Sequence, residues 1–479
     1  MAYRNLGEYL ADLEKRGELH RVKVEVDPVL EMAEVAARLV RGGGPAVLFE
    51  RARGSPYPVA MNLFGTPARV RLALGGDPDE IGRRLASWLE LPRLENWGDR
   101  LRALPRLAEA ASYLPRRVSR APCQQVVEEN PSLGDLPVLQ CWPGDGGRFL
   151  TLPLVITRDP ASGRANVGMY RMQVYDDRTL GVHWHIHKDG ARHAGLLRPG
   201  ERLPVAVALG GDPALIYAAT APLPAVLDEY LFAGLLRRAP VELVRAVSVD
   251  LEVPAEAEFV LEGYVEVGEE RLEGPFGDHT GYYSPPEPYP VFHLTALTRR
   301  RDPVYPATVV GAPPMEDAWL GKATERIFLP LLRLLVPDLV DLDLPVEGVF
   351  HNLAIVSIRK RYPGHARQVM SALWGLGLLA LTKVLVVVDG DVDVHDYRQV
   401  TWVVGTSVDP GRDITIVPGP LDTLDHAAPY PAYGTKMGID ATRKWPGEGQ
   451  VRPWPERAEM SAEIRELVDR RWEEYGFER

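Results

Sequence analysis

The chain has 479 residues, of which 46% are hydrophobic and 25% are charged. This balance predicts a folded protein with two or three cores, not a disordered chain. The formal net charge of -11 argues against nucleic acid as a partner, because binding to phosphates requires a basic face. Two cysteines occur, Cys123 and Cys141, and the first residues lack the apolar core of a signal peptide. We therefore predict a cytoplasmic protein with two free thiols.

The first 115 residues show the pattern of a small α/β domain. Residues 5–15 predict a helix that ends at Gly17, residues 21–26 a strand, and the residues after Asp27 a second helix that ends at a glycine run. Two further strands are predicted at 45–50 and 58–65, and a helix at 77–91. A Pro- and Arg-rich stretch at 104–122 predicts a connector.

Short runs of strand-forming residues dominate the next part of the chain, 116–312. They predict a barrel or sandwich core that is interrupted by one helix at 227–238. The predicted strands are 151–159, 166–175, 180–187, 202–210, 258–267 and 291–299.

Helical and apolar strand patterns alternate over residues 313–455, which predicts a parallel sheet covered by helices. The helices are expected at 323–335, 364–377 and 396–406, and the strands at 353–358, 383–389 and 413–419. Residues 369–388 approach the length and apolarity of a membrane span. Two glycines, Lys383 and the β-branched run VLVVV instead favour a buried helix followed by a central parallel strand.

The last segment, 456–479, predicts an amphipathic helix over 460–472. Ile464, Leu467, Val468 and Trp472 fall on one side of it. Such a face docks either on the chain's own body or on another subunit.

Three histidines alternate in the sequence HWHIH. If this segment is a strand, His183, His185 and His187 project from one face, and Asn166 offers an oxygen nearby. Three imidazoles on one face suit a divalent metal. The alternative is that one or two of them are surface histidines or hydrogen-bonded core histidines.

Two carboxylates, Glu273 and Asp278, flank a Gly-Pro-Phe-Gly turn. Paired carboxylates in a partly apolar pocket have separated pKa values, so that one of them can donate a proton. The alternative is a turn at a strand end with solvated acids. Farther along, Lys436 follows Gly434 and Thr435, a composition able to hold a phosphate but weak evidence alone.

These clusters, together with the segments CWPGDGGRF, LPLVITRD, LEVPAEAE and KMGIDATRKWPGE, resemble the UbiD family of decarboxylases along most of the chain. The resemblance is closest to the branch that acts on polyprenyl-hydroxybenzoates and related quinone precursors. It implies a multidomain α/β protein with an N-terminal α/β domain (1–115), a central split β-barrel flavin-binding domain (116–312) and a C-terminal α/β domain with a parallel sheet (313–455). The helix in 456–479 would then be an oligomer contact.

The resemblance also implies prenylated FMN as the cofactor, made by a UbiX-type prenyltransferase, with a divalent ion, often Mn²⁺, at its phosphate. Some members also hold K⁺. Mapped by motif, the implied metal ligands are Asn166, His187 and Glu229. The implied cofactor contacts are Met169, Tyr170, Arg171, His183, Trp184, His185, Lys188 and Asp189, with Lys436 at the phosphate.

Arg171, Glu273 and Asp278 are the catalytic group that the resemblance implies. Arg171 would hold the substrate carboxylate, Glu273 would orient Arg171, and Asp278 would protonate the carbon after CO2 leaves. Many relatives carry glutamate where this chain has Asp278, and the shorter side chain leaves the proton path open.

The expected substrate is a quinone-pathway acid, such as a polyprenyl-hydroxybenzoate or a naphthoate, and the alternative is a simple phenolic or cinnamate-like acid. A polyprenylated substrate would imply peripheral membrane contact, and relatives form dimers and hexamers. Two readings from other classes stay open at this point. One is a metal-dependent hydrolase with His183, His185 and Asp278 around zinc. The other is a non-catalytic flavin or nucleotide-binding scaffold.

Overall fold

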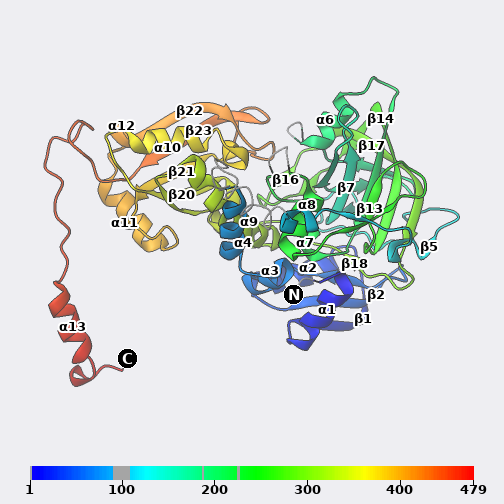
Figure 1. Cartoon of the computed structure of the whole chain (residues 1–479), viewed down its shortest axis with the longest axis horizontal. Helices are drawn as coiled ribbons and strands as arrows, with labels where there is room; N and C mark the ends of the chain where they lie inside the picture. The colour runs from blue at the N-terminus through cyan, green and yellow to red at the C-terminus, as the bar shows by residue number, and fades with distance from the viewer. Residues whose placement is uncertain (1–2, 90–107, 186–187, 224–226, 479) are drawn as a thin grey trace.

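The computed structural model describes residues 3–89, 108–185, 188–223 and 227–478. Figure 1 shows the large central sheet at the right, the C-terminal sheet at the left and the N-terminal elements below the central sheet. The last helix stands away from the other elements. Most of the predicted elements are present. The strands at Leu339–Asp343 and Tyr433–Asp440 were not predicted, and two predicted strands near the candidate site differ in extent.

The N-terminal elements form a four-stranded sheet in the order β1 (Leu19–Val26), β2 (Ala46–Ala52), β3 (Val59–Met61) and β18 (Tyr305–Pro306). Four helices accompany it: α1 (Leu6–Lys15), α2 (Glu31–Arg41), α3 (Pro67–Leu74) and α4 (Pro78–Leu89). Asn5 caps α1 by accepting a hydrogen bond from the Glu8 amide, and the buried residues of α1 recur at helical spacing. Because β18 pairs in parallel with β3, the central part of the chain completes this sheet.

The central part is built on a nine-stranded sheet whose strand pairs are all antiparallel. Its path runs β6 (Phe149–Leu150), β9 (Met172–Val174), β10 (Thr179–Val182), β17 (Glu287–Arg299), β14 (Phe259–Glu273), β11 (Arg202–Leu209), β7 (Pro153–Arg158) and β8 (Ala165–Met169), with β5 (Val126–Val127) on β17. No described pair joins β6 to β8, so the sheet is open and not a closed barrel.

Smaller elements surround this sheet. They are the helices α6 (Asp189–Gly195), α7 (Pro213–Ala218) and α8 (Glu229–Arg237), the 3₁₀ turn η1 (Pro122–Gln124), a three-stranded sheet of β13 (Glu252–Pro254), β12 (Glu242–Arg245) and β4 (Arg116–Arg117), and the hairpin of β15 (Phe276–Gly277) and β16 (Tyr283–Ser284). The predicted helix at 227–238 is confirmed as α8.

Two predicted strands of the central part are wrong in their extent. The predicted strand at 166–175 is divided into β8 and β9 at Tyr170 and Arg171, and the predicted strand at 180–187 ends at Val182. His183 and His185 therefore follow β10 and do not alternate on a strand face. The His183 amide still donates to the Arg171 carbonyl at 3.2 Å, but the next amide, that of Trp184, donates back to the Val182 carbonyl at 2.8 Å, so the backbone turns out of the sheet. Beyond the turn Trp184 is buried, and the side chain of His183 hydrogen-bonds Glu273 at the end of β14.

The C-terminal part holds a five-stranded sheet in the order β19 (Leu339–Asp343), β20 (Leu353–Ile358), β21 (Val384–Asp389), β23 (Tyr433–Asp440) and β22 (Ile414–Pro420). The three inner strands are parallel, as the apolar run VLVVV predicted, and the two outer strands are antiparallel. The accompanying elements are α9 (Glu316–Leu335), η2 (Val346–His351), α10 (His365–Leu373), η3 (Gly377–Leu381), α11 (Tyr397–Ser407) and α12 (Pro410–Asp413).

The apolar segment 369–388 is the end of α10, then η3, then β21. The prediction of a helix followed by a central strand is therefore confirmed. Among the helices that the structure describes, none has the length and apolarity needed to cross a membrane.

The terminal helix α13 (Ala462–Arg470) is followed by the turn η4 (Glu473–Tyr475). None of the residues of α13 is buried, and the helix lies apart from the other described elements (Figure 1). The helix was predicted, but its apolar side does not dock on the chain's own body.

Candidate active site

Arg171 is the centre of a buried group of charges. It lies in the break between β8 and β9, where the backbone leaves the sheet. Its Nε and Nη2 donate to the two oxygens of Glu273 at 2.7 and 2.9 Å, and its Nη1 contacts the Asp278 carboxylate. The guanidinium also lies 4.5 Å from the ring centroid of Phe276. The structure therefore brings together the three residues that the resemblance assigned to catalysis.

Both carboxylates of this group are ionised at neutral pH. Burial alone would raise the pKa of Glu273, but hydrogen bonds from His183 and Arg171 outweigh it and hold the pKa at about 2. Burial also opposes the charge of Asp278. There the hydrogen bond and charge of His279, together with the charge of Arg171, hold the pKa well below its usual range. Asp278 can therefore donate a proton only after receiving one.

His183 and His185 line the same region from the segment after β10. His183 Nδ1 donates to Glu273 at 3.0 Å, and its ring centroid lies 4.2 Å from that of Tyr289. The rings of His183 and His185 are 4.7 Å apart, and His185 Nδ1 lies 3.2 Å from the hydroxyl of Thr423 in the C-terminal part.

The zinc set of the hydrolase reading is not supported by this arrangement. In the part of the chain that the structure describes, the ligand atoms of His183, His185 and Asp278 do not converge. The described donor groups that do converge are His279, His351 and Asp422 in one place and Glu325, Asp343 and His395 in another. The carboxylates of the second group already have cation partners, because Lys322 pairs with both Glu325 and Asp343 and Arg326 also pairs with Glu325.

The other predicted flavin contacts lie around the end of β8 and the start of α6. Met169 is the last residue of β8, and Tyr170 is buried, which raises its pKa to about 12. Trp184 is buried, and among the described residues its indole N–H has no hydrogen-bond partner; a Cβ added at Gly190 would lie only 2.6 Å from that nitrogen. Lys188 and Asp189 are exposed at the start of α6.

Two of the three predicted metal ligands lie together. Asn166 is buried on β8, and Glu229 accepts a hydrogen bond at 3.0 Å from the backbone N–H of Val167, the residue after Asn166. No cation among the described residues pairs with Glu229, and burial raises its pKa to about 7. A half-buried carboxylate without a cation partner, beside an amide, is a donor set that fits a hard divalent ion. His187 lies outside the described residues.

Lys436 lies on β23, and its amine donates to the carbonyls of Ala380 and Thr382, the latter at 3.2 Å. Burial lowers its pKa to about 8. None of these contacts joins Lys436 to the group around Arg171, so its contact with a phosphate stays a prediction.

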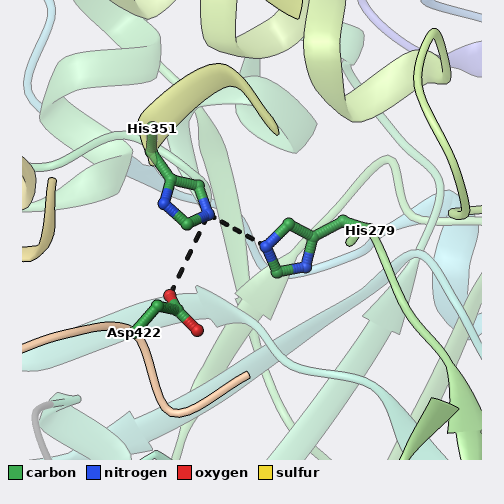
Figure 2. Close-up of side chains that lie close together, drawn as sticks. All are labelled: His279, His351 and Asp422. Carbon is green, nitrogen blue, oxygen red and sulfur yellow. Dashed lines mark hydrogen bonds and ion pairs between the residues drawn. The ribbon is translucent and has the colours of Figure 1, made fainter. Parts of the chain in front are cut away.

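Three residues that complete the group had no predicted role. His279 Nδ1 lies 2.8 Å from Asp278 Oδ1, and its Nε2 lies 2.9 Å from His351 Nε2. Asp422 Oδ2 lies 4.0 Å from the same nitrogen of His351 (Figure 2). His279 adjoins a predicted site residue and could have been suspected. No local pattern marks His351, which is 72 residues away.

Comparison with known proteins identifies the chain. Three family models for 3-octaprenyl-4-hydroxybenzoate carboxy-lyase match it: the N-terminal domain over residues 10–89, the Rift-related domain over 116–313 and the C-terminal domain over 318–441. A protein of Archaeoglobus fulgidus is 56% identical over 478 residues, which is 99% of each chain.

Solved structures are similar over the same length. Vanillic acid decarboxylase from Sedimentibacter hydroxybenzoicus in its closed form has a TM-score of 0.86 at 29% identity, covering 99% of each chain. HmfF from Pelotomaculum thermopropionicum, a UbiD-class enzyme in complex with FMN, has a TM-score of 0.79 at 34% identity, covering 97% of this chain and 99% of that one.

The fold and these matches define a carboxy-lyase, that is, a decarboxylase. The chain belongs to the UbiD family.

Proposed function

We propose that the protein catalyses the non-oxidative decarboxylation of an aromatic carboxylic acid, with prenylated FMN as its cofactor. The observation that carries this proposal is the buried arrangement of Arg171 between Glu273 and Asp278. A guanidinium in this position can hold a substrate carboxylate, and an adjacent acid can supply the proton that replaces CO2. HmfF, a similar UbiD-class enzyme, was solved in complex with prenylated FMN and with FMN.

Prenylated FMN, when bound, supplies an electron sink for the electron pair that CO2 leaves behind. The chain's own residues bind and orient the substrate. Glu273 occupies two nitrogens of Arg171 and fixes the plane of the guanidinium. A substrate carboxylate that approaches Arg171 competes with Asp278 for the same cation and adds negative charge beside it. Both effects raise the pKa of Asp278, so that it can take up a proton and pass it to the substrate carbon.

Asn166 and Glu229, with His187 as the predicted third ligand, would hold a divalent ion such as Mn²⁺ at the cofactor phosphate, and K⁺ is a further candidate ion. A UbiX-type prenyltransferase would supply the cofactor. We further propose that the protein is cytoplasmic and assembles as a dimer or hexamer.

The substrate that we propose is a quinone precursor, either a 4-hydroxy-3-polyprenylbenzoate or a naphthoate. The description of the family models, which names an octaprenyl-hydroxybenzoate, supports it. A polyprenylated substrate would bring the enzyme into peripheral contact with a membrane. Simple phenolic acids are the second candidate, because vanillic acid decarboxylase is similar to this chain over its whole length.

The test is anaerobic co-expression with a UbiX-type prenyltransferase, followed by mass spectrometry of the released cofactor and measurement of CO2 release. The panel of acids contains a polyprenyl-hydroxybenzoate, a naphthoate, vanillate and cinnamate. We expect prenylated FMN near one per chain and the fastest CO2 release from a quinone precursor. Faster release from vanillate would move the substrate to the phenolic acids, and no release from any acid would refute the proposal.

Asp278→Asn serves as the matched variant in this assay. It should lower turnover by at least about 100-fold, the usual contribution of a general acid, while the flavin stays bound. Asp302→Asn, a change at an exposed aspartate, is the control and should behave as wild type. Normal turnover by Asp278→Asn would remove Asp278 from the mechanism.

A further inference from the structure

We propose that His279 and His351 form a proton relay, charge-balanced by Asp422, that reloads Asp278 after each turnover. This inference rests on the proposed decarboxylation and adds to it the residues that bring the proton. Decarboxylation consumes one proton for each CO2 released, so an acid that protonates the product carbon must be recharged from solvent every cycle.

The contacts form a continuous chain away from Asp278. Its Oδ1 accepts hydrogen bonds from both the amide and Nδ1 of His279, at 2.7 and 2.8 Å. The two bonds fix the imidazole relative to the carboxylate. The other ring nitrogen of His279 lies 2.9 Å from Nε2 of His351, a distance at which one of the two nitrogens must carry the proton. The pair therefore holds a proton in line with Asp278.

The relay joins two parts of the molecule. His279 lies in the loop between β15 and β16 of the central part, whereas His351 ends η2 and Asp422 follows β22 in the C-terminal part (Figure 2). The hydrogen bond between Thr423 and His185 crosses the same boundary. The relay is therefore complete only when the two parts are in contact.

The loop that carries His351 is held in a strained conformation. Val349 and Phe350, the two residues before it, have φ angles of 59° and 38°, in the left-handed region that side chains other than glycine rarely adopt. Such backbone conformations are unfavourable on their own and persist only where the surrounding packing holds them. The ring of Phe350 packs 5.6 Å from that of His279, and Gly321 leaves room for it. Packing thus fixes His351 where it meets His279.

Three acids surround His279, namely Asp278, Asp422 and Asp317. Burial opposes a positive charge on His279, but the hydrogen bond and charge of Asp278 outweigh it and raise the pKa to about 9. Asp317, on α9, is itself buried, which raises its pKa to about 7, so it adds less negative charge. At neutral pH His279 therefore already carries the proton that Asp278 needs.

His351 faces His279, Asp422, Lys188 and Asp278. Burial and then the neighbouring charge of His279 lower the pKa of His351 to about 4, while the two carboxylates act in the opposite direction. His351 therefore stays neutral while His279 is charged, and becomes the better acceptor once His279 has given its proton away. One positive charge is shared by the pair.

The proton balance is simple. The bond between the substrate carbon and CO2 breaks, and a C–H bond forms with the proton of Asp278. When the next substrate carboxylate binds, His279 gives its Nδ1 proton to the Asp278 carboxylate and keeps the proton on Nε2. The neutral ring then turns to present its unprotonated nitrogen to His351, and one solvent proton, entering on the side of His351 and Asp422, restores the charge of the histidine pair. For each carboxylate consumed, one solvent proton ends on the product and one CO2 leaves.

The test uses the flavin-loaded holoenzyme with His351→Gln and Asp422→Asn. The control is His395→Gln, because His395 lies in the same part of the chain but pairs with Asp341 and Asp343. Three quantities are measured: CO2 released in the first turnover, steady-state kcat as a function of pH, and exchange of deuterium from solvent into the product.

We expect His351→Gln to release CO2 normally in the first turnover. Its kcat and its deuterium exchange should fall together by about tenfold or more in the alkaline range, with a smaller loss in acid, where solvent protons are abundant. Added imidazole should restore both rates. Asp422→Asn should show the same pattern to a smaller degree, and His395→Gln should behave as wild type.

Several results would overturn the relay. One is a wild-type pH profile and exchange rate in His351→Gln. Another is loss of CO2 release in its first turnover, which would place His351 on the substrate. A third is a second metal ion in the wild type that disappears in His351→Gln, which would make the cluster a metal site. A wrong proposed function would give a different result from a wrong relay, because the wild type would then release no CO2 from any acid.

Discussion

Replacing Glu273 by glutamine tests the electrostatic core of the site. Glu273 is completely buried at the end of β14, and its two oxygens accept hydrogen bonds from Arg171 and His183. Glutamine has nearly the same shape but no charge and a single acceptor oxygen. Its amide nitrogen would face donors, which leaves Arg171 with one buried counter-charge fewer.

The size of the effect follows from the pKa of Glu273, which is lowered from 4.5 to about 2. At about 1.4 kcal/mol for each pKa unit, the ionised carboxylate contributes about 3 kcal/mol to folding. Because the folded-state pKa is the lower one, this contribution is complete above pH 4.5 and is lost as the pH falls towards 2. This value agrees with the cost of about 3–5 kcal/mol for breaking a buried ion pair in other proteins.

The assay is denaturant unfolding of the wild type, Glu273→Gln and Glu270→Gln, a control at an exposed position of the same strand. At neutral pH Glu273→Gln should lose about 3 kcal/mol, and Glu270→Gln should stay within about 0.5 kcal/mol of wild type. The deficit of Glu273→Gln should shrink as the solution is acidified below pH 4.5. Equal stability at neutral pH, or a deficit that acid does not reduce, would refute this reasoning.

Two further changes test the cofactor site and the assembly. Glu229→Ala should lose metal and flavin together, measured as the amount of each per chain. The control Glu129→Ala, at an exposed position, should retain both. A full complement of cofactor in Glu229→Ala would refute the ligand assignment. The double change Ile464→Asp and Leu467→Asp should dissociate the oligomer in light-scattering measurements. Covering the exposed part of each apolar side chain contributes about 1 kcal/mol, and a carboxylate at the same place would have to be buried without a partner. Glu466→Gln on the same helix should leave the assembly intact, and an unchanged mass for the double variant would show that α13 is not an interface.

Local sequence patterns were sufficient to predict those helices and strands that need only apolar neighbours and not one particular side chain. The β-branched run of β21 predicted a strand buried on both faces, and any apolar neighbours on the two sides satisfy it. The spacing of Ile464 and Leu467 likewise predicted the amphipathic helix α13. The convergence of Arg171, Glu273 and Asp278 came from the resemblance to a family and not from spacing alone.

The tertiary structure decided what depends on one particular neighbour. The strand predicted through His183 and His185 ends at Val182, where the Trp184 amide turns back to the Val182 carbonyl and the His183 side chain hydrogen-bonds Glu273, 90 residues away in sequence. Lys436 has a composition that favours phosphate, yet in the structure it satisfies two backbone carbonyls beside β23.

The contact between His279 and His351 depends in the same way on the packing of two separate parts of the chain. Periodicity encodes which face of an element is buried, since that depends only on near neighbours in sequence. It does not encode which side chain from a distant segment will meet that face, and the proton path to Asp278 is made of such contacts.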